Sequence, residues 1–173
     1  MIMTPRLRKA ALTAHVTVSV GWLGAVAAYL ALAVAGLTTP DSEMAESAYR
    51  AMEVIGLGIV VPCSLAALLS GLLQSLGTEW GLFRYYWIVA KLSLTVVATG
   101  VLLMHVPAVS RMARLAVSTS LSTGDFRLLR VQLVVHAVGG LLVLITATAL
   151  SVYKPCGRIG SARARTAGEL TAR

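Results

Sequence analysis

Four long apolar stretches, separated by shorter polar segments, make up most of this chain. They cover approximately residues 10–37, 51–76, 85–110 and 131–153. Each stretch exceeds the roughly 20 residues that a helix needs to cross the hydrocarbon core of a bilayer. Backbone polar groups in lipid must pair within the chain, and the stretches lack the alternating pattern of a β-barrel, so we expect helices. The predicted fold is all-α, a polytopic membrane protein built as an up-down bundle of four transmembrane helices.

The composition supports this assignment. Hydrophobic residues make up 57% of the 173 residues, charged residues only 13%, and the mean hydropathy is +0.81. A soluble domain carries about 25% charged residues. We therefore expect one transmembrane domain over residues 1–156. The last residues, 157–173, read "GRIGSARARTAGELTAR" and contain little apolar surface to bury, so we expect a disordered basic tail there.

The distribution of basic residues predicts the orientation. The net charge is +8, but the basic residues lie mainly at helix ends and in the tail, which favours anionic lipid headgroups over nucleic acid as partners. The basic N-terminus and tail, with an acidic first loop over 38–50, place both termini in the cytoplasm. The Ala, Val, Leu and Arg bias points to the cytoplasmic membrane of a bacterium. The predicted third loop, 111–130, opposes this orientation because it carries Arg111, Arg114, Arg127 and Arg130.

Several ionisable residues fall inside the predicted spans, where each costs roughly 2.5–3.5 kcal/mol to insert if it lies at the centre. With a rise of about 1.5 Å per residue, Glu53 and His105 lie about 3 Å below the outer surface and His136 about 8 Å. Gln132 precedes His136 by one turn. Three potential ligands from three helices thus fall within a layer of about 5 Å.

A second polar layer is expected near the cytoplasmic side. His15 lies about 8 Å in on the first helix and Lys91 about 9 Å in on the third, with Gln74 near the inner end of the second. Lys91 and His105 share roughly one face of their helix, because fourteen residues are close to four turns. Pro62 should kink the second helix.

Each of these residues also has a purely structural interpretation. His105 can sit at the interface, His15 can hydrogen-bond a neighbouring helix, and Lys91 can extend its ammonium group to the headgroups. Glu53 can form a surface ion pair with Arg50. For His136 the corresponding interpretation is an interhelical hydrogen bond, with these candidate partners: Thr95, Thr99 and Ser64.

The residue types point to metal or haem chemistry. Two histidines and a carboxylate, here His105, His136 and Glu53, are a reasonable set for copper or zinc. Paired histidines from His136, His105 and His15 can instead hold haem b between helices. The third and fourth helices should be neighbours, and neighbouring helix axes lie about 8–10 Å apart, which leaves little room for a haem between them.

The first helix reads "HVTVSVGWLGAVAAYLALAV". A histidine followed by Trp22, Leu23 and Gly24 resembles small integral membrane proteins of unknown function from actinobacteria. It also distantly resembles CopD-type copper-resistance membrane proteins. The resemblance implies that this motif lies on a membrane helix and that histidines such as His15 are metal or haem ligands. Ala25 stands where CopD-type sequences have a second glycine.

The chain carries no phosphate-binding loop, no GxSxG and no HExxH, so nothing in the sequence indicates an enzyme. Two functions remain open. The first is a binding or redox module that holds haem b or a metal ion through intramembrane histidines. The second is a non-catalytic membrane subunit or scaffold, whose polar residues serve helix packing and contacts with a membrane protein partner or a second copy of the chain.

Overall fold

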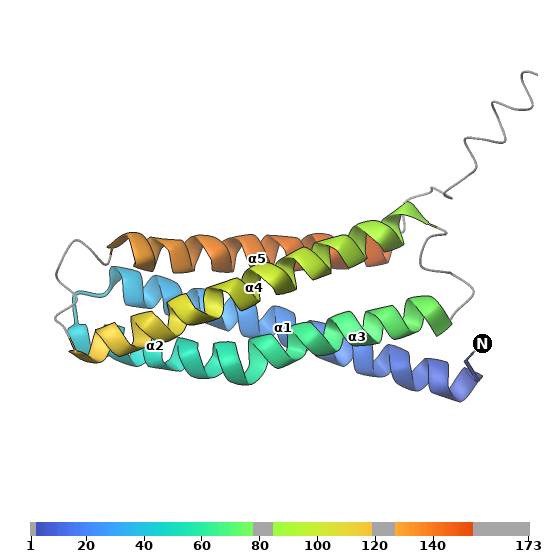
Figure 1. Ribbon diagram of the computed structural model, residues 1–173, viewed down its shortest axis with the longest axis horizontal. Helices are drawn as coiled ribbons and strands as arrows, with labels where there is room; N and C mark the ends of the chain where they lie inside the picture. The colour runs from blue at the N-terminus through green and yellow to red at the C-terminus, as the bar shows by residue number, and fades with distance from the viewer. Residues whose placement is uncertain (1–2, 78–84, 119–126, 154–173) are drawn as a thin grey trace, which may run out of the picture.

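A computed structural model describes residues 3–77, 85–118 and 127–153 of the protein. The chain folds into long antiparallel helices (Figure 1). The elements are α1 (Pro5–Thr38), α2 (Ser42–Ile55), the π-helical segment η1 (Gly56–Val60), α3 (Val61–Gly77), α4 (Tyr86–Ser118) and α5 (Arg127–Tyr153). Because α2, η1 and α3 follow one another without a break, they form one span, hereafter the α2–α3 span.

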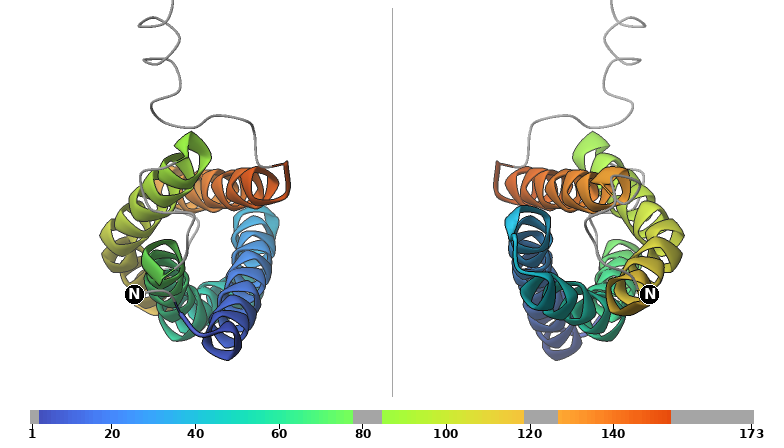
Figure 2. Two further views of the ribbon diagram at one scale, coloured as in Figure 1. Left: turned by 90° about the vertical axis from the view of Figure 1, so that its right-hand side faces the viewer. Right: turned by 90° about the vertical axis from the view of Figure 1, so that its left-hand side faces the viewer.

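The prediction of an all-α bundle of four spans is confirmed. All four helical spans are long and apolar enough to cross a membrane. Viewed from either end, they are arranged around the bundle in the order α1, α2–α3, α4, α5, so that α5 also lies beside α1 (Figure 2). α1 and α4 are diagonal. The length and composition of the spans identify a multi-pass membrane protein.

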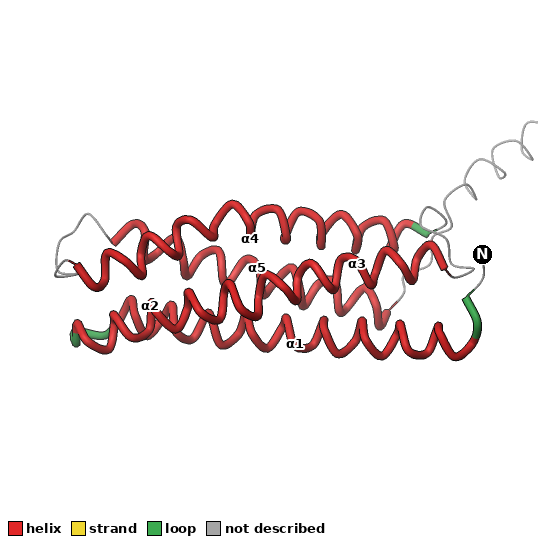
Figure 3. The backbone as a smooth tube through the Cα atoms, turned by 60° about the horizontal axis from the view of Figure 1, so that its bottom comes forward, coloured by secondary structure: helices red, strands yellow, loops and turns green. Residues whose placement is uncertain are grey.

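The predicted first loop, 38–50, is mostly wrong. The Asp41 side chain accepts a hydrogen bond from the backbone N–H of Glu43 at 2.9 Å, which caps a helix that begins at Ser42. Only residues 39–41 connect α1 to α2, and Figure 3 shows how short this connection is. Hydropathy predicted where the apolar part of this span begins, whereas the Asp41 cap determines where the helix itself begins.

The predicted third loop, 111–130, is wrong in the same way. α4 continues to Ser118 and α5 begins at Arg127, so the four arginines of this segment lie on helices. The second connection, 77–84, the middle of the predicted third loop, 119–126, and the predicted tail, 157–173, lie outside the described residues, apart from Gly77, which ends α3.

The distortion predicted at Pro62 takes the form of the π-helical segment η1, which ends two residues before the proline. Proline has no N–H and its ring collides with the carbonyl four residues earlier, here that of Gly58. The wider π turn accommodates this loss, and Figure 1 shows the span changing direction where α2 passes into α3. A second proline, Pro107, lies inside α4.

Arg130, in the first turn of α5, ties three spans together. Its Nε donates to the Tyr49 hydroxyl of α2 at 2.9 Å. Its terminal nitrogen donates to the carbonyl oxygens of Gly36 and Leu37, the latter at 3.2 Å. These carbonyls belong to the last turn of α1, which has no helical partners for them and carries partial negative charge. The sequence predicted Arg130 in an exposed loop, but the residue lies on α5 and holds this helix to α1 and α2.

Glycine is required at position 36 by the same contact. A Cβ built on Gly36 would stand 2.8 Å from the Tyr49 ring, and Tyr49 is almost completely buried. Beside it lies a cluster of buried residues from all four spans: Ala33, Ala45, Met52, Met112 and Leu133. The end of the bundle where α1 ends and α5 begins is therefore held by the Arg130 guanidinium and by the tightly packed Tyr49 ring.

We expect Arg130→Met to lower the free energy of unfolding by about 2 kcal/mol, because hydrogen bonds from a charged donor are lost and the Tyr49 hydroxyl stays buried without a partner. Unfolding in mixed micelles of rising denaturing detergent measures this. The matched control is Arg127→Met, three residues earlier on the same helix and exposed. Equal stability of the two variants would contradict the assignment.

Candidate functional site

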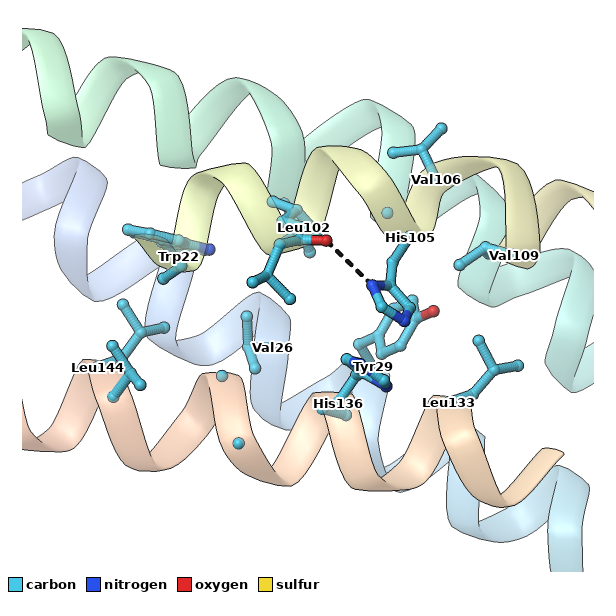
Figure 4. Close-up of a pocket in the computed structure, with 18 of the residues that line it drawn as sticks. Trp22, Val26, Tyr29, Leu102, His105, Val106, Val109, Leu133, His136 and Leu144 are labelled. Carbon is cyan, nitrogen blue, oxygen red and sulfur yellow. Dashed lines mark hydrogen bonds between the residues drawn. The ribbon is translucent and has the colours of Figure 1, made fainter. Parts of the chain in front are cut away.

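Two of the predicted intramembrane histidines meet. His105 comes from α4 and His136 from α5, and their imidazole rings stack with centroids 3.5 Å apart and planes inclined by 36°. Both side chains lie in the space between the two helices (Figure 4). The structure thus brings together two histidines that are 31 positions apart in the sequence.

Hydrogen bonds determine which nitrogen of each ring carries the proton. His105 Nδ1 lies 3.0 Å from the carbonyl oxygen of Val101, and His136 Nδ1 lies 2.7 Å from that of Gln132. A carbonyl oxygen only accepts, so Nδ1 is the donor in both rings. In a neutral imidazole, a proton on Nδ1 leaves Nε2 as the acceptor.

Gln132 distinguishes the two histidines. Its side-chain amide lies 3.3 Å from Nε2 of His105, which therefore accepts a hydrogen bond. No hydrogen-bond partner of His136 Nε2 occurs among the described residues. The expected interhelical bond from His136 to Thr95, Thr99 or Ser64 is absent there, and the buried Thr99 hydroxyl itself lacks a partner within the same ranges. One lone pair, that of His136, is left for a ligand.

The pair forms part of the wall of a cavity of about 390 Å³ to which all four spans contribute. Most of the lining is aliphatic. The polar or aromatic members of the wall are Trp22, Tyr29, Glu53, His105 and His136. No lysine or arginine of the described ranges lines it. Ligand sites in proteins typically combine such an apolar surface with a few placed polar groups, and this volume lies within their usual range.

The cavity exists because several positions in its wall have no side chain. Gly56 in η1 and Gly139 and Gly140 in α5 all line it. A Cβ built on Gly139 would meet nothing within 4 Å, whereas one on Gly140 would reach Val26 of α1 at 3.9 Å. The irregular turn before Pro62 adds to the missing volume. In a bundle of regular helices with larger residues, this space would be filled.

Glu53 also lines the cavity, as its expected depth implied. The predicted surface ion pair with Arg50 is wrong, because Arg50 pairs with Glu46 at 2.7 Å. The carboxylate of Glu53 makes no hydrogen bond or ion pair with any described residue. However, the described part of the chain contains no group of three metal-ligating side chains. Glu53 and the two histidines therefore share a cavity without forming a ready metal centre.

The second polar layer lies towards the other end of the bundle and ties helices together. His15 Nδ1 lies 2.8 Å from the Ser70 hydroxyl of α3, and the Gln74 amide donates to the Ala11 carbonyl of α1 at 3.3 Å. The Lys91 ammonium lies 5.5 Å from the centre of the Trp87 ring. None of these residues lines the cavity. His15 is thus separated from the other two histidines.

Sequence reasoning missed the apolar wall of the cavity. Trp22, singled out only for its motif, and Tyr29 both line it and come from α1. A tyrosine in mid-span and a Gly-Gly pair one turn after a histidine were the available signals. The role of Arg130 was also missed, because its partners are 81 or more positions away in the sequence.

Comparisons of the chain with models of protein families, with curated proteins and with solved structures give no match. The functional argument therefore rests on geometry and chemistry.

We expect nitrogen NMR of the protein labelled at its histidines to show His105 and His136 with a protonated Nδ1 and an unprotonated Nε2 at neutral pH. The reason is that the carbonyl acceptors at Val101 and Gln132 hold the Nδ1 protons. Substitution of each histidine in turn assigns the signals. A protonated Nε2 on His136 would contradict the ligand site described above.

Proposed function

We propose that this protein is an integral membrane binding module of the bacterial cytoplasmic membrane, and that the cavity beside the His105–His136 pair is its ligand site. The supporting observation is the Nε2 of His136, which has no hydrogen-bond partner among the described residues and lies on the wall of an apolar cavity of about 390 Å³. A polar group inside a membrane span is costly, and one left without a protein partner is a functional candidate.

Haem b fits this site in one form only. The two rings stack at 3.5 Å, which is van der Waals contact, so a porphyrin does not pass between them. His136 Nε2 would be the ligand to the iron, and the aliphatic side chains of the cavity would surround the rest of the group. A bound haem would supply electron transfer, which is the redox role that paired histidines suggested.

A copper or zinc ion fits less directly. It needs several ligand atoms at about 2.0–2.2 Å, and His105 Nε2 already accepts from Gln132. The amide must move before both imidazoles can bind one ion, with Glu53 as the nearest further candidate in the wall. We therefore favour a cofactor held by His136 alone over a metal ion held by both histidines.

The orientation with both termini in the cytoplasm remains our proposal. The third-loop arginines opposed it, but Arg130 is bonded to α1 and α2 and so is accounted for by the fold. The remaining basic residues at the helix ends and in the tail favour contact with anionic lipid headgroups.

A second candidate function is a non-catalytic membrane subunit that contacts a partner protein or another copy of the chain. The observation in its favour is that the other intramembrane polar residues hold helices together: Arg130 joins three spans, and His15 and Gln74 join α1 to α3. The cavity and the free imidazole nitrogen have no role in this alternative.

We expect the detergent-purified protein, titrated with haem b, to show a Soret band and an α-band on reduction. His136→Ala should weaken binding at least tenfold, because the axial bond is lost. The matched control is His15→Ala, which removes a histidine of the other polar layer and should leave the bands unchanged. Elemental analysis of the same preparation tests for copper and zinc.

If no band forms and no metal is found, ligation by iron or another metal is excluded. If instead His15→Ala removes the bands and His136→Ala does not, the cofactor belongs to the layer near α3 and the assignment to the cavity is wrong.

A further inference from the structure

The cavity is open towards the surrounding lipid between α4 and α5. Three aliphatic residues of its wall are also exposed on the outside of the bundle: Val97 by 63%, Val101 by 41% and Val135 by 59%. In a membrane, this outside is the hydrocarbon layer. The wall is therefore continuous with the lipid rather than sealed from it.

The opening follows from the residues that face each other there. α4 and α5 are antiparallel, so the turn of α4 before His105 stands opposite the turn of α5 after His136. The first carries Val101 and the second carries Gly139 and Gly140. Gly139 has no side chain, and a Cβ built there would meet nothing within 4 Å, so this position of α5 contributes no side chain to the space between the two helices. Figure 4 shows the two helices on either side of the cavity, with the lining residues Val26 and Tyr29 of α1 behind the space between them.

The charges of the wall select the chemistry of the ligand. The titratable side chains of the wall are Tyr29, Glu53 and the two histidines, and no lysine or arginine of the described chain lines the cavity. A carboxylate or phosphate headgroup would therefore lack a cation and would face the Glu53 side chain. His136 Nε2 accepts hydrogen bonds and does not donate them in the neutral ring. The wall thus suits a neutral molecule that presents a hydroxyl group.

We propose that the cavity binds a neutral, membrane-dissolved molecule with an apolar body and a hydroxyl head, which enters sideways from the lipid between α4 and α5 and donates a hydrogen bond to His136 Nε2. Long-chain hydroquinones are the class with this chemistry. This inference rests on the proposed function in one respect, that the cavity is the ligand site. It differs in the occupant, because a hydroxyl head would donate to the His136 Nε2 that haem b would use as an iron ligand, so the two molecules would compete for one site.

Trp22 provides a built-in probe, because it lines the cavity and is 4% exposed. We would replace Trp80 and Trp87 with phenylalanine and reconstitute the otherwise complete chain in neutral phosphatidylcholine vesicles. A decyl-substituted hydroquinone is then titrated under anaerobic conditions while the Trp22 fluorescence is recorded. The matched ligand is its dimethyl ether, which has the same body and no hydroxyl donor.

We expect saturable quenching by the hydroquinone, with an apparent affinity about three- to tenfold higher than that of the dimethyl ether, which is the usual contribution of one hydrogen bond. His136→Phe should make the two compounds bind equally. Gly139→Leu should weaken quenching at least tenfold by filling the opening. Gly100→Leu is its control, because Gly100 is an exposed glycine of α4 that is outside the cavity wall and has nothing within 4 Å of a built Cβ.

Quenching that rises linearly, without saturation and equally in the Gly139→Leu and Gly100→Leu proteins, would overturn the inference. Equal affinity of the hydroquinone and its ether in the protein with His136 intact would do so as well, and that comparison needs no cavity variant to fold. Haem binding that depends on His136 without any hydroquinone effect would leave the proposed function standing and refute this occupant. Absence of both would refute both proposals.

Discussion

A helix bundle in lipid has no water with which to satisfy a polar side chain, so every such group in its interior needs a partner from the protein or from a ligand. This constraint organises the present structure. Arg130 meets the open end of α1 and the Tyr49 hydroxyl, and His15 meets Ser70. Helix positions, the need for glycine at position 36 and the relation between distant spans all follow from such pairings.

Against this background, the His105–His136 pair is unusual. Each ring gives its Nδ1 proton to a carbonyl of its own helix, so neither bond holds α4 to α5. The rings touch each other, and the amide of Gln132 satisfies one of the two remaining nitrogens. The remaining acceptor, His136 Nε2, has no partner among the described residues. It lies on the wall of a cavity that glycines and a π-helical turn keep open. Residues that only stabilised the bundle would have filled that space.

The two polar layers therefore have different roles. In the layer of His15, Gln74 and Lys91, every residue contacts another side chain or a backbone carbonyl. His15 and Gln74 join α1 to α3, and Lys91 lies beside Trp87 on its own helix. The layer of His105, His136 and Glu53 surrounds a cavity open to the lipid. That difference supports a binding site beside His136 and helix packing around His15.

Hydrophobicity alone determined the fold class, because roughly twenty apolar residues cannot be placed elsewhere than in a membrane-crossing helix. Depth along each helix was also predictable from the rise per residue, which is why Glu53, His105 and His136 were expected in one layer. The first and last residues of the helices were not predictable in this way, because caps such as Asp41 lie outside the apolar stretches. Which faces meet, which nitrogen is free and where Gly139 leaves a gap depend on contacts between residues far apart in the chain. Only the tertiary structure decided these, because helical periodicity orients side chains within a helix and not one helix against another.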